Sequence, residues 1–452
     1  MKKTIKLALS ASLLLGATSA FATNGDLMIG QGAQSRAMGG VGIAKSFGAQ
    51  SALANPAMIS SVKNMEITGV ATYFAPSVSF GSNAASTAGG STAAPTMADS
   101  ATPASVIPEI YFAQRINESL VYGVSITGVA GMGTDYDSST TAANPAGTNG
   151  SFGMTTALSI AKVAIPVSYS TSGFTIGLAP VLQYGVLQMN YTKQSPTTGA
   201  YSRSNNPKSS STGFGYELGL SYDMKDAGVE GLTLAAVYKS KIAMKYANNI
   251  ASALTDFGVK SVKSGDKLDQ PAEIGLGLSY AMSGNTIAID YKNIQWSKAA
   301  GYGDFGWKDQ NTVAVGYEYA TNSWAFRTGF NYGKSPIAEQ ANAQGNPQTY
   351  DGGAINFFNL SGFPGVVKEH LTIGGGYNIS DALSLNAAVV YAPKVTVSYN
   401  TSGMTAGMVY NAQIANGATK TAAGTAAAGA GASTANVTHS QMGVTIAATY
   451  KF

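Results

Sequence analysis

The 452-residue sequence predicts an all-β fold, a 14-stranded antiparallel transmembrane β-barrel with an N-terminal plug inside its lumen. Three observations support this prediction. Charged residues make up only 11% of the chain, whereas a soluble protein normally carries about 25%. No apolar run in the expected mature chain is long enough for a membrane-spanning helix, and many segments alternate apolar with small or polar residues. Strands that alternate lipid-facing and lumen-facing residues produce this combination.

Residues 1–22 have the pattern of a secretory signal peptide. Three lysines precede a short apolar run at residues 7–15, and Ala20-Phe21-Ala22 fits a cleavage site, so the mature chain is expected to begin at Thr23. Removing these lysines leaves 24 of the 27 basic residues against 23 acidic ones, a balance that predicts no nucleic-acid partner. The chain contains no cysteine, so disulfides cannot contribute to the fold.

Period-two alternation recurs along the rest of the chain. In the last segment, apolar side chains occupy every second position from Met442 to Phe452, with mostly small or polar residues between them. A single-chain bacterial barrel needs an even number of strands, and fourteen segments qualify. The expected strands are residues 66–76, 106–116, 120–134, 153–169, 174–191, 212–222, 232–246, 271–282, 286–296, 311–320, 324–334, 367–378, 383–399 and 440–452.

The connections between these segments alternate in length. Residues 77–105 form a long connection, residues 117–119 a short one, and the alternation continues toward the C-terminus. Long connections therefore share one end of the barrel, expected to be external, and short turns share the periplasmic end. Residues 422–435 contain only Ala, Gly, Ser and Thr, which predicts a flexible external loop tip.

Residues 23–61 are rich in Gly, Ala and Ser and are too few to bury a core of their own. They are expected to be ordered only as a plug inside the barrel formed by residues 62–452. Arg36 is a lone arginine beside Met38-Gly39-Gly40, and a short helical run at 49–54 ends at Asn55-Pro56-Ala57 because proline disfavours helix in the residue before it.

The order of these motifs resembles the N-terminal hatch of the FadL family, outer-membrane channels for long-chain fatty acids and other hydrophobic compounds. Residues 107–112 with 122–127 are similar to the second and third strands of the family, and residues 323–329 with 335–337 to its eleventh strand and the loop that follows. The resemblance implies passive transport of a hydrophobic ligand, a long-chain fatty acid in the first place. A neutral aromatic or aliphatic hydrocarbon is the alternative, and a porin-like or adhesive barrel without a hydrophobic site is the alternative of another class.

The resemblance also implies where such a molecule would bind and what the barrel would contact. Ligands would be captured at the external loops, pass to a pocket beside the plug, and leave sideways through the wall. The barrel would contact outer-membrane lipid and lipopolysaccharide, and terminal Phe452 suits recognition by the outer-membrane assembly machinery. Fatty-acid members use basic residues on interior strands for the ligand carboxylate, whereas the fifth strand here offers Gln183, Gln188 and Asn190, so the head group stays open.

The third expected strand is unusually rich in glycine. Gly123, Gly128, Gly131 and Gly133 lie on it, and glycine in a strand often marks a bulge or a close approach of another backbone. The family resemblance implies a kink that opens the wall sideways at this strand. We expect the kink near Gly128 and Gly131, with Asn55-Pro56-Ala57 packed beside it; simple packing against the plug is the alternative.

Strand parity directs a set of charged side chains into the lumen. The simplest interpretation is a solvated interior whose charges balance, and the sharper one is that some of these residues hold the plug. Arg36 would then pair with a carboxylate such as Glu318 or Glu217. Glu318 and Arg327 should lie within diagonal cross-strand reach. The inward set is Glu217, Glu273, Asp290, Lys292, Glu318 and Arg327.

Four apolar residues in the long connection at 335–366 are candidates for external capture of the ligand: Phe357, Phe358, Leu360 and Phe363. An exposed apolar patch commonly marks a binding surface, but a collapsed loop core is an equal alternative.

The sequence offers little for chemistry. Its two histidines, His370 and His439, are expected at external strand ends, and no Ser or Asp is placed by motif to partner either of them. We therefore expect no enzyme. Neither a metal nor another cofactor is expected, because cysteine is absent and no helix follows the glycine-rich stretches as a phosphate loop requires.

Overall fold

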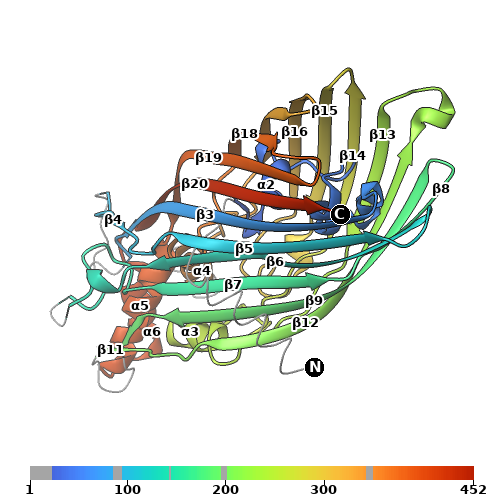
Figure 1. Cartoon of the computed structure of the whole chain (residues 1–452). Coiled ribbons are helices and arrows are strands. Elements are labelled where there is room, and N and C mark those ends of the chain that lie inside the picture. Colours follow the sequence, from blue (N-terminus) through green and yellow to red (C-terminus); the bar gives the residue numbers. More distant parts are fainter. Residues whose placement is uncertain (1–22, 85–93, 142–143, 195–200, 343–349) are drawn as a thin grey trace.

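The computed structural model describes residues 23–84, 94–141, 144–194, 201–342 and 350–452; the expected signal peptide, residues 1–22, lies outside the described residues. Its main feature is a closed antiparallel barrel (Figure 1). Each wall strand pairs with the next in the sequence, and the ring closes where β20 pairs with β3 from Ala435 opposite Ser82 to Lys451 opposite Glu66. The fourteen expected strands are therefore all present.

The wall strands are β3 (Met65–Ser82), β5 (Ser105–Arg115), β6 (Leu120–Asp135), β7 (Thr155–Ala164) with its continuation β8 (Val167–Thr171), β9 (Phe174–Asn190), β12 (Ser209–Asp223), β13 (Leu232–Lys239), β14 (Glu273–Met282), β15 (Asn285–Ile294), β16 (Gln310–Ala320), β17 (Trp324–Gly333), β18 (Glu369–Asn378), β19 (Leu383–Asn400) and β20 (Thr434–Lys451). The fourth expected strand is divided into β7 and β8 at Ile165-Pro166 because proline has no N–H to donate to the ladder. Both parts still pair with β6 and β9.

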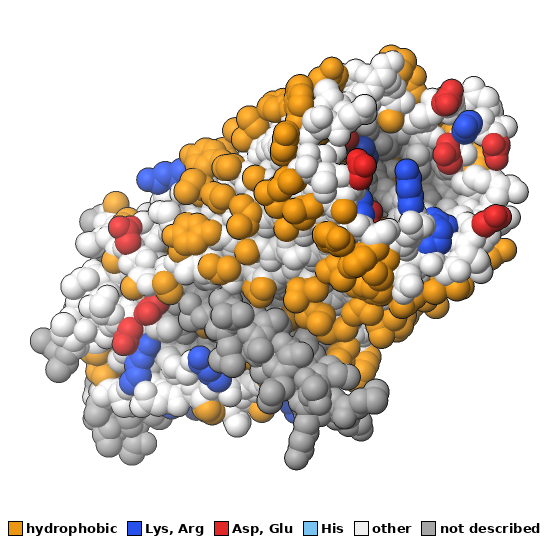
Figure 2. Space-filling model, viewed as in Figure 1, with side chains coloured by type: hydrophobic (Ala, Val, Ile, Leu, Met, Phe, Trp, Pro, Cys, Tyr) orange, Lys and Arg blue, Asp and Glu red, His pale blue; other side chains and the backbone are white. Residues whose placement is uncertain are grey.

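Side chains alternate across the wall as period two requires. On β14, for example, Ile274, Leu276 and Leu278 face outward and Glu273 and Ser279 are buried. Figure 2 shows apolar side chains spread over the outer surface, and charged ones gathered around the hollow at one end. Within the described ranges, no helix is both long and apolar enough to span a membrane.

Long and short connections lie at opposite ends of the barrel. The helices of the long connections gather at one end in Figure 1, at the opposite end from the C-terminus. In bacterial outer-membrane barrels the long connections face the cell exterior, so we call this the external end. Its elements are β4 (Ala98–Asp99), η3 (Asp137–Ser139), β10 (Thr192–Gln194), β11 (Tyr201–Arg203), α3 (Ile250–Asp256), η5 (Trp296–Lys298), α4 (Tyr350–Ser361), α5 (Ser402–Ala415) and α6 (Lys420–Ala428), whereas η4 (Met224–Ala227) lies in a connection at the other end.

The connection between β19 and β20 is more regular than the sequence predicts. Of residues 422–435, expected as a flexible tip, residues 422–428 belong to α6 and residues 434–435 begin β20. Alanine is the strongest helix former, and the Thr419 hydroxyl caps α6 by accepting a hydrogen bond from the Ala422 N–H at 3.2 Å. Ala427 of α6 packs against Ala406 of α5, which gives this small-residue helix a buried face.

Candidate functional site

The N-terminal segment, residues 23–61, lies inside the barrel (Figure 1). It begins with a hairpin of β1 (Thr23–Asn24) and β2 (Leu27–Met28), followed by α2 (Gly32–Ala37), η1 (Gly48–Leu53) and η2 (Pro56–Ser61). Hydrogen bonds and ion pairs attach this segment to inward-facing side chains of several wall strands.

Arg36 of α2 makes the most buried of these attachments. Its guanidinium forms an ion pair with Glu109 of β5 and donates to Thr72 Oγ1 of β3 at 2.7 Å. Glu109 also accepts hydrogen bonds from the Gly32 N–H at 2.9 Å and the Tyr111 hydroxyl at 2.6 Å. The expected pairing of Arg36 with Glu318 or Glu217 is therefore wrong. Strand parity would have found Glu109, because it shares the inward face of β5 with Tyr111.

Glu318 binds a different cation of the N-terminal segment. Its carboxylate contacts Lys45 Nζ at 2.8 Å and Arg327 Nε at 2.6 Å. Glu318 and Arg327 are directly opposite each other in the ladder of β16 and β17, not diagonal as expected. Arg327 also donates to Asn386 Oδ1 at 2.9 Å. Sequence reasoning did not identify Lys45, which is the second cation of the segment.

Two further attachments use the backbone of the segment. Asp290 Oδ2 of β15 accepts hydrogen bonds from the N–H groups of Gly42 and Ile43 at 2.7 and 2.9 Å. On the β17 and β18 side, the Gly39 N–H donates to Thr372 Oγ1 at 2.9 Å, and Asn331 Nδ2 donates to the Gly39 carbonyl at 3.1 Å. The segment is thus held from several sides of the lumen.

Asn55-Pro56-Ala57 lies against β9 and β12. Asn55 caps η2 by accepting from the Ala57 N–H at 3.0 Å, and its amide donates to the Ile43 carbonyl at 2.8 Å. The motif fits into a hollow made by Gly177 and Gly219, which are directly paired, and a Cβ at Gly219 would stand 1.9 Å from Asn55 Oδ1. The expectation that this motif packs beside Gly128 and Gly131 is therefore corrected.

The glycine-rich strand β6 carries a bulge where the sequence predicts an irregularity. The register with β7 shifts between Gly128 and Ala130, which leaves Val129 as an extra residue. The segment that packs against this bulge is the N-terminal hairpin. Leu27 pairs with Ala130, and the Gly131 N–H donates to the Asp26 carbonyl at 3.1 Å.

A charged cavity of about 40 Å³ lies between the N-terminal segment and the wall. A buried water needs roughly 10–15 Å³ of such space, so the cavity can hold a few waters. Glu217 pairs here with Lys162 at 3.7 Å, and Glu273 with Lys239 at 3.9 Å. Lys292, Leu27 and Val129 are among the other residues that line it, and Val129 is the bulged residue of β6.

The expected capture residues form a closed core at the external end. Phe357 and Phe358 lie on α4 and, like Leu360, are 0% exposed, while Phe363 is 6% exposed. Phe357 packs edge-on against Phe80 with ring centroids 5.6 Å apart, and Phe358 packs against Phe257 at 5.0 Å. The structure therefore has the collapsed loop core and not an exposed apolar patch.

The two histidines are also buried. One ring nitrogen of His439 lies 2.8 Å from the Pro364 carbonyl, and the other lies 3.1 Å from Gln441 Nε2. His370 is 0% exposed on β18. Neither residue is accessible at an external strand end, where the sequence places them.

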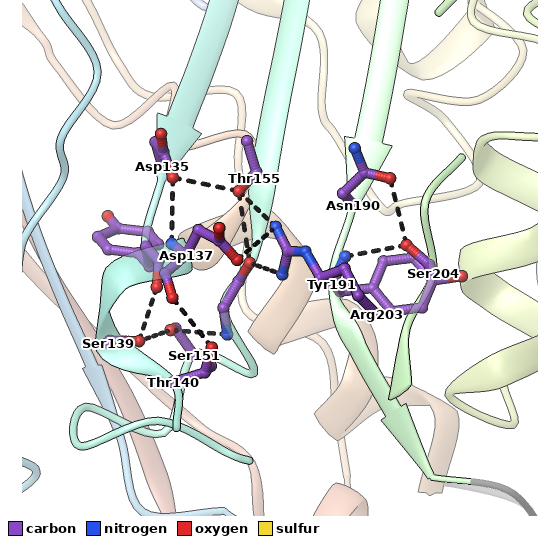
Figure 3. A network of polar contacts seen from close by, with 12 residues as sticks. Asp135, Asp137, Ser139, Thr140, Ser151, Thr155, Asn190, Tyr191, Arg203 and Ser204 are labelled. Atoms are coloured by element: carbon purple, nitrogen blue, oxygen red, sulfur yellow. Dashed lines mark hydrogen bonds and ion pairs between the residues drawn. The ribbon is translucent and has the colours of Figure 1, made fainter. Parts of the chain in front are cut away.

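Polar contacts join two external connections to each other at the external ends of β6, β7 and β9 (Figure 3). Arg203 of β11 donates to Thr155 Oγ1 at 2.8 Å and pairs with Asp137 at 3.1 Å. Asp135 accepts from Thr155 Oγ1 at 3.2 Å. This network fixes the connections over the external end of the bulged strand.

Comparison with known proteins identifies the family. Residues 14–349 match the family model described as outer membrane protein transport protein (OMPP1/FadL/TodX). The chain belongs to this family. It is an outer-membrane protein of bacteria. The long-chain fatty acid transport proteins of Shigella flexneri and Escherichia coli (strain K12) are each 24% identical over 336 residues, which cover 63% of this chain and 72% of the relative.

Solved structures of this family have the same fold. A Pseudomonas aeruginosa FadL homologue superposes with a TM-score of 0.65 at 15% identity and covers 95% of this chain and 100% of its own. The Pseudomonas putida toluene transporter TodX superposes with a TM-score of 0.62 at 17% identity, over 94% of this chain and 99% of its own.

Proposed function

We propose that this family member carries hydrophobic compounds passively across the outer membrane, with residues 23–61 as the plug of a barrel formed by residues 62–452. A ligand is captured at the external end, moves to a pocket beside the N-terminal hairpin, and leaves sideways through the wall at β6. The observation that carries the proposal is the bulge at Val129, against which the hairpin packs.

The energetics of release favour a sideways exit. Each buried methylene is worth roughly 0.8 kcal/mol, so a sixteen-carbon chain loses on the order of 10 kcal/mol when it enters periplasmic water. Release into the bilayer avoids this loss. A gap in the wall needs interrupted strand hydrogen bonds, and a bulge with an unpaired residue supplies that interruption.

Capture requires that the closed core at the external end rearranges. Phe357, Phe358, Leu360 and Phe363 belong to a buried cluster with Phe80, Phe152 and Phe257. An apolar ligand can replace the contacts that these side chains make with one another, since dispersion and burial are nondirectional. We infer that the ligand enters by separating α4 from the neighbouring connections.

Long-chain fatty acids are the first ligand class we propose, and neutral aromatic or aliphatic hydrocarbons are the second. Curated relatives are named long-chain fatty acid transport proteins, and one structural neighbour is named a toluene transporter. The charged cavity bears on this choice because three lysines, Lys162, Lys239 and Lys292, face two glutamates there. A carboxylate can be accommodated among them, whereas a neutral hydrocarbon gains nothing from them.

The outer surface supports further proposed contacts. The outward-facing apolar side chains would contact outer-membrane lipid and lipopolysaccharide. Phe452 is 56% exposed and packs on Tyr450 with ring centroids 4.7 Å apart, so it is free for the assembly machinery to bind.

Uptake by the double variant Gly128→Val/Gly131→Val tests the exit. Two β-branched residues should straighten β6 and abolish uptake of radiolabelled oleate and toluene, while heat-modifiable gel mobility still reports a folded barrel. Gly69→Val is the matched control, because Gly69 is also a wall-strand glycine and a Cβ there meets nothing within 4 Å. Wild-type uptake by the folded double variant would place the exit elsewhere. Passage of small hydrophilic sugars in liposome swelling would favour the porin-like alternative.

A further inference from the structure

Asp26 occupies the turn of the N-terminal hairpin and is completely buried. Its carbonyl oxygen accepts the hydrogen bond from the Gly131 N–H, just past the bulge. Its carboxylate accepts hydrogen bonds from the Tyr302 hydroxyl and, at 3.4 Å, from Gln270 Nε2. One residue therefore connects the hairpin, β6 and two external connections.

Tyr302 belongs to an aromatic group that packs over the same turn. Its ring centroid lies 4.7 Å from those of Trp296 and Trp307, which are 5.0 Å from each other. The hairpin fits beneath these rings because residue 25 is glycine at φ +72°, and a Cβ there would stand 2.6 Å from Trp296 Cζ2. The turn is thus enclosed by the connection at residues 295–309.

We propose that Asp26 is a positioning residue that couples the external connections to the bulge of β6. While its carboxylate is held by Tyr302 and Gln270, its carbonyl holds the hairpin against Gly131. A ligand that separates Tyr302 from Asp26 frees the hairpin from the wall. The inference rests on the proposed lateral route and adds the contact that regulates it.

The surroundings of Asp26 make this coupling sensitive to pH. Burial raises the pKa of the Asp26 carboxyl, which lies outside the fourteen wall strands, from 3.8 to about 6, although the hydrogen bonds from Tyr302 and Gln270 oppose the rise. Glu273 of β14 adds a like charge, and Tyr246 of the connection at 240–272 also faces Asp26. Among the described residues, Asp26 Oδ1 has no hydrogen-bond partner, so the charged carboxylate is incompletely compensated.

The docked and the released hairpin bind the Asp26 proton with different affinities. A released hairpin exposes Asp26 to water, where its pKa returns to the ordinary value, so the docked hairpin binds the proton more tightly. Protonation therefore favours docking. Docking should be weakest above pH 7, strengthen as the pH falls through 6, and stop strengthening below the ordinary pKa near 4.

Thiol labelling of the hairpin measures docking without relying on transport. The chain has no cysteine, so Asn24→Cys introduces a single thiol at a position that is 3% exposed when the hairpin is docked. Its labelling rate with a methanethiosulfonate reagent, in purified protein reconstituted in nanodiscs, is compared with and without Asp26→Asn. The asparagine amide has the shape of the aspartate side chain and is neutral at every pH. Taking the ratio of the two labelling rates at each pH cancels the pH dependence of the thiol's own reactivity.

The parent should label about one hundred-fold faster than Asp26→Asn at pH 7.5 and about tenfold faster at pH 5, as the pKa difference of about two units requires. Asp26→Asn should also slow oleate uptake at pH 7.5. Tyr302→Phe removes a hydrogen-bond donor to the charged Asp26 carboxylate. As the pH falls, the decrease in its labelling rate should therefore begin at a higher pH than in the parent. Asp269→Asn is the matched control. Asp269 is a buried acid next to Gln270 in the connection at 240–272, and it accepts a hydrogen bond from the Met244 N–H at 3.0 Å. It should keep the parent profile.

Two results would overturn the inference. One is a ratio near one at every pH in a folded Asp26→Asn protein, and the other is a Tyr302→Phe profile identical to the parent. Either result leaves the proposed transport function standing, because labelling does not depend on uptake. Loss of uptake in a variant whose labelling matches that of the parent would show that the substitution impairs a transport step other than docking of the hairpin.

Discussion

Arg36 of the N-terminal segment and Glu109 of β5 form an ion pair whose side chains are 2% and 0% exposed. Such a pair is costly to break by removing one partner, because the remaining charge stays buried. The same carboxylate holds the Gly32 N–H, so one glutamate fixes both the start of α2 and its cation. Glu109 therefore makes two of the contacts that hold α2 in the lumen, while Thr72 of β3 and Thr372 of β18 bond Arg36 and the Ala37 carbonyl.

Replacing Glu109 by Ala should weaken the attachment of the N-terminal segment by about 3–5 kcal/mol, because Arg36 loses its carboxylate. The barrel has its own ladder of strands and should remain folded. Limited proteolysis should then cut the segment faster in Glu109→Ala than in the parent, with unchanged heat-modifiable mobility. Glu230→Ala, at an exposed acid on a short connection, is the control and should behave as the parent. Equal proteolysis of both variants would show that Arg36 does not anchor the segment.

The barrel could be predicted from the sequence because strand alternation is local. Each wall strand needs only its own residues to define its two faces, so the sequence predicts that Glu318 and Arg327 share the inward face, although it predicts a diagonal contact where the strands pair them directly. The division between β7 and β8 also has a local signal, because Pro166 cannot donate to the ladder.

The contacts of the N-terminal segment could not be predicted in the same way. The lumen contains several inward carboxylates, including Glu109, Glu217 and Glu318, and the rotation of the segment inside the barrel decides which of them meets Arg36. The hollow that receives Asn55 needs the register of β9 and β12, because Gly177 and Gly219 are far apart in the sequence and become neighbours only when these strands pair.

The helix that carries Phe357 and Phe358 was missed for a related reason. Its segment contains Gly352 and Gly353, and glycine weakens a helix by about 1 kcal/mol relative to alanine. Aromatic packing against Phe80 of β3 and against Phe152 and Phe257 of other connections stabilises it. No signal within residues 350–361 reports these partners.

The double variant Phe357→Ser/Phe358→Ser should lower uptake of oleate and toluene alike. Each removed ring leaves a cavity and costs about 3–5 kcal/mol of packing in the external core. Uptake is measured in cells with equal amounts of folded protein, since destabilised connections could also reduce expression. Phe357→Leu retains most of the apolar volume and should keep uptake within a few-fold of the parent. Unchanged uptake of both compounds by the serine variant would remove this core from the pathway.

Deletion of Val129 tests the exit more sharply than substitution does. Gly128 pairs with Ala161 and Ala130 with Ile160, so removing the residue between them leaves every other pair of β6 and β7 intact and makes the ladder continuous. Side chains beyond the bulge keep their faces, because the bulge itself reverses the alternation: inward Thr127 would be followed by inward Ala130 and Met132. The deletion should therefore preserve folding and abolish uptake of both ligand classes.

A second bulge provides the matched control, since the register of β19 and β20 shifts between Ala392 and Val395. Deletion of Lys394 should make that ladder continuous without touching β6. Uptake by the Val129 deletion at the parental rate, together with its loss on deletion of Lys394, would move the exit to the wall between β19 and β20.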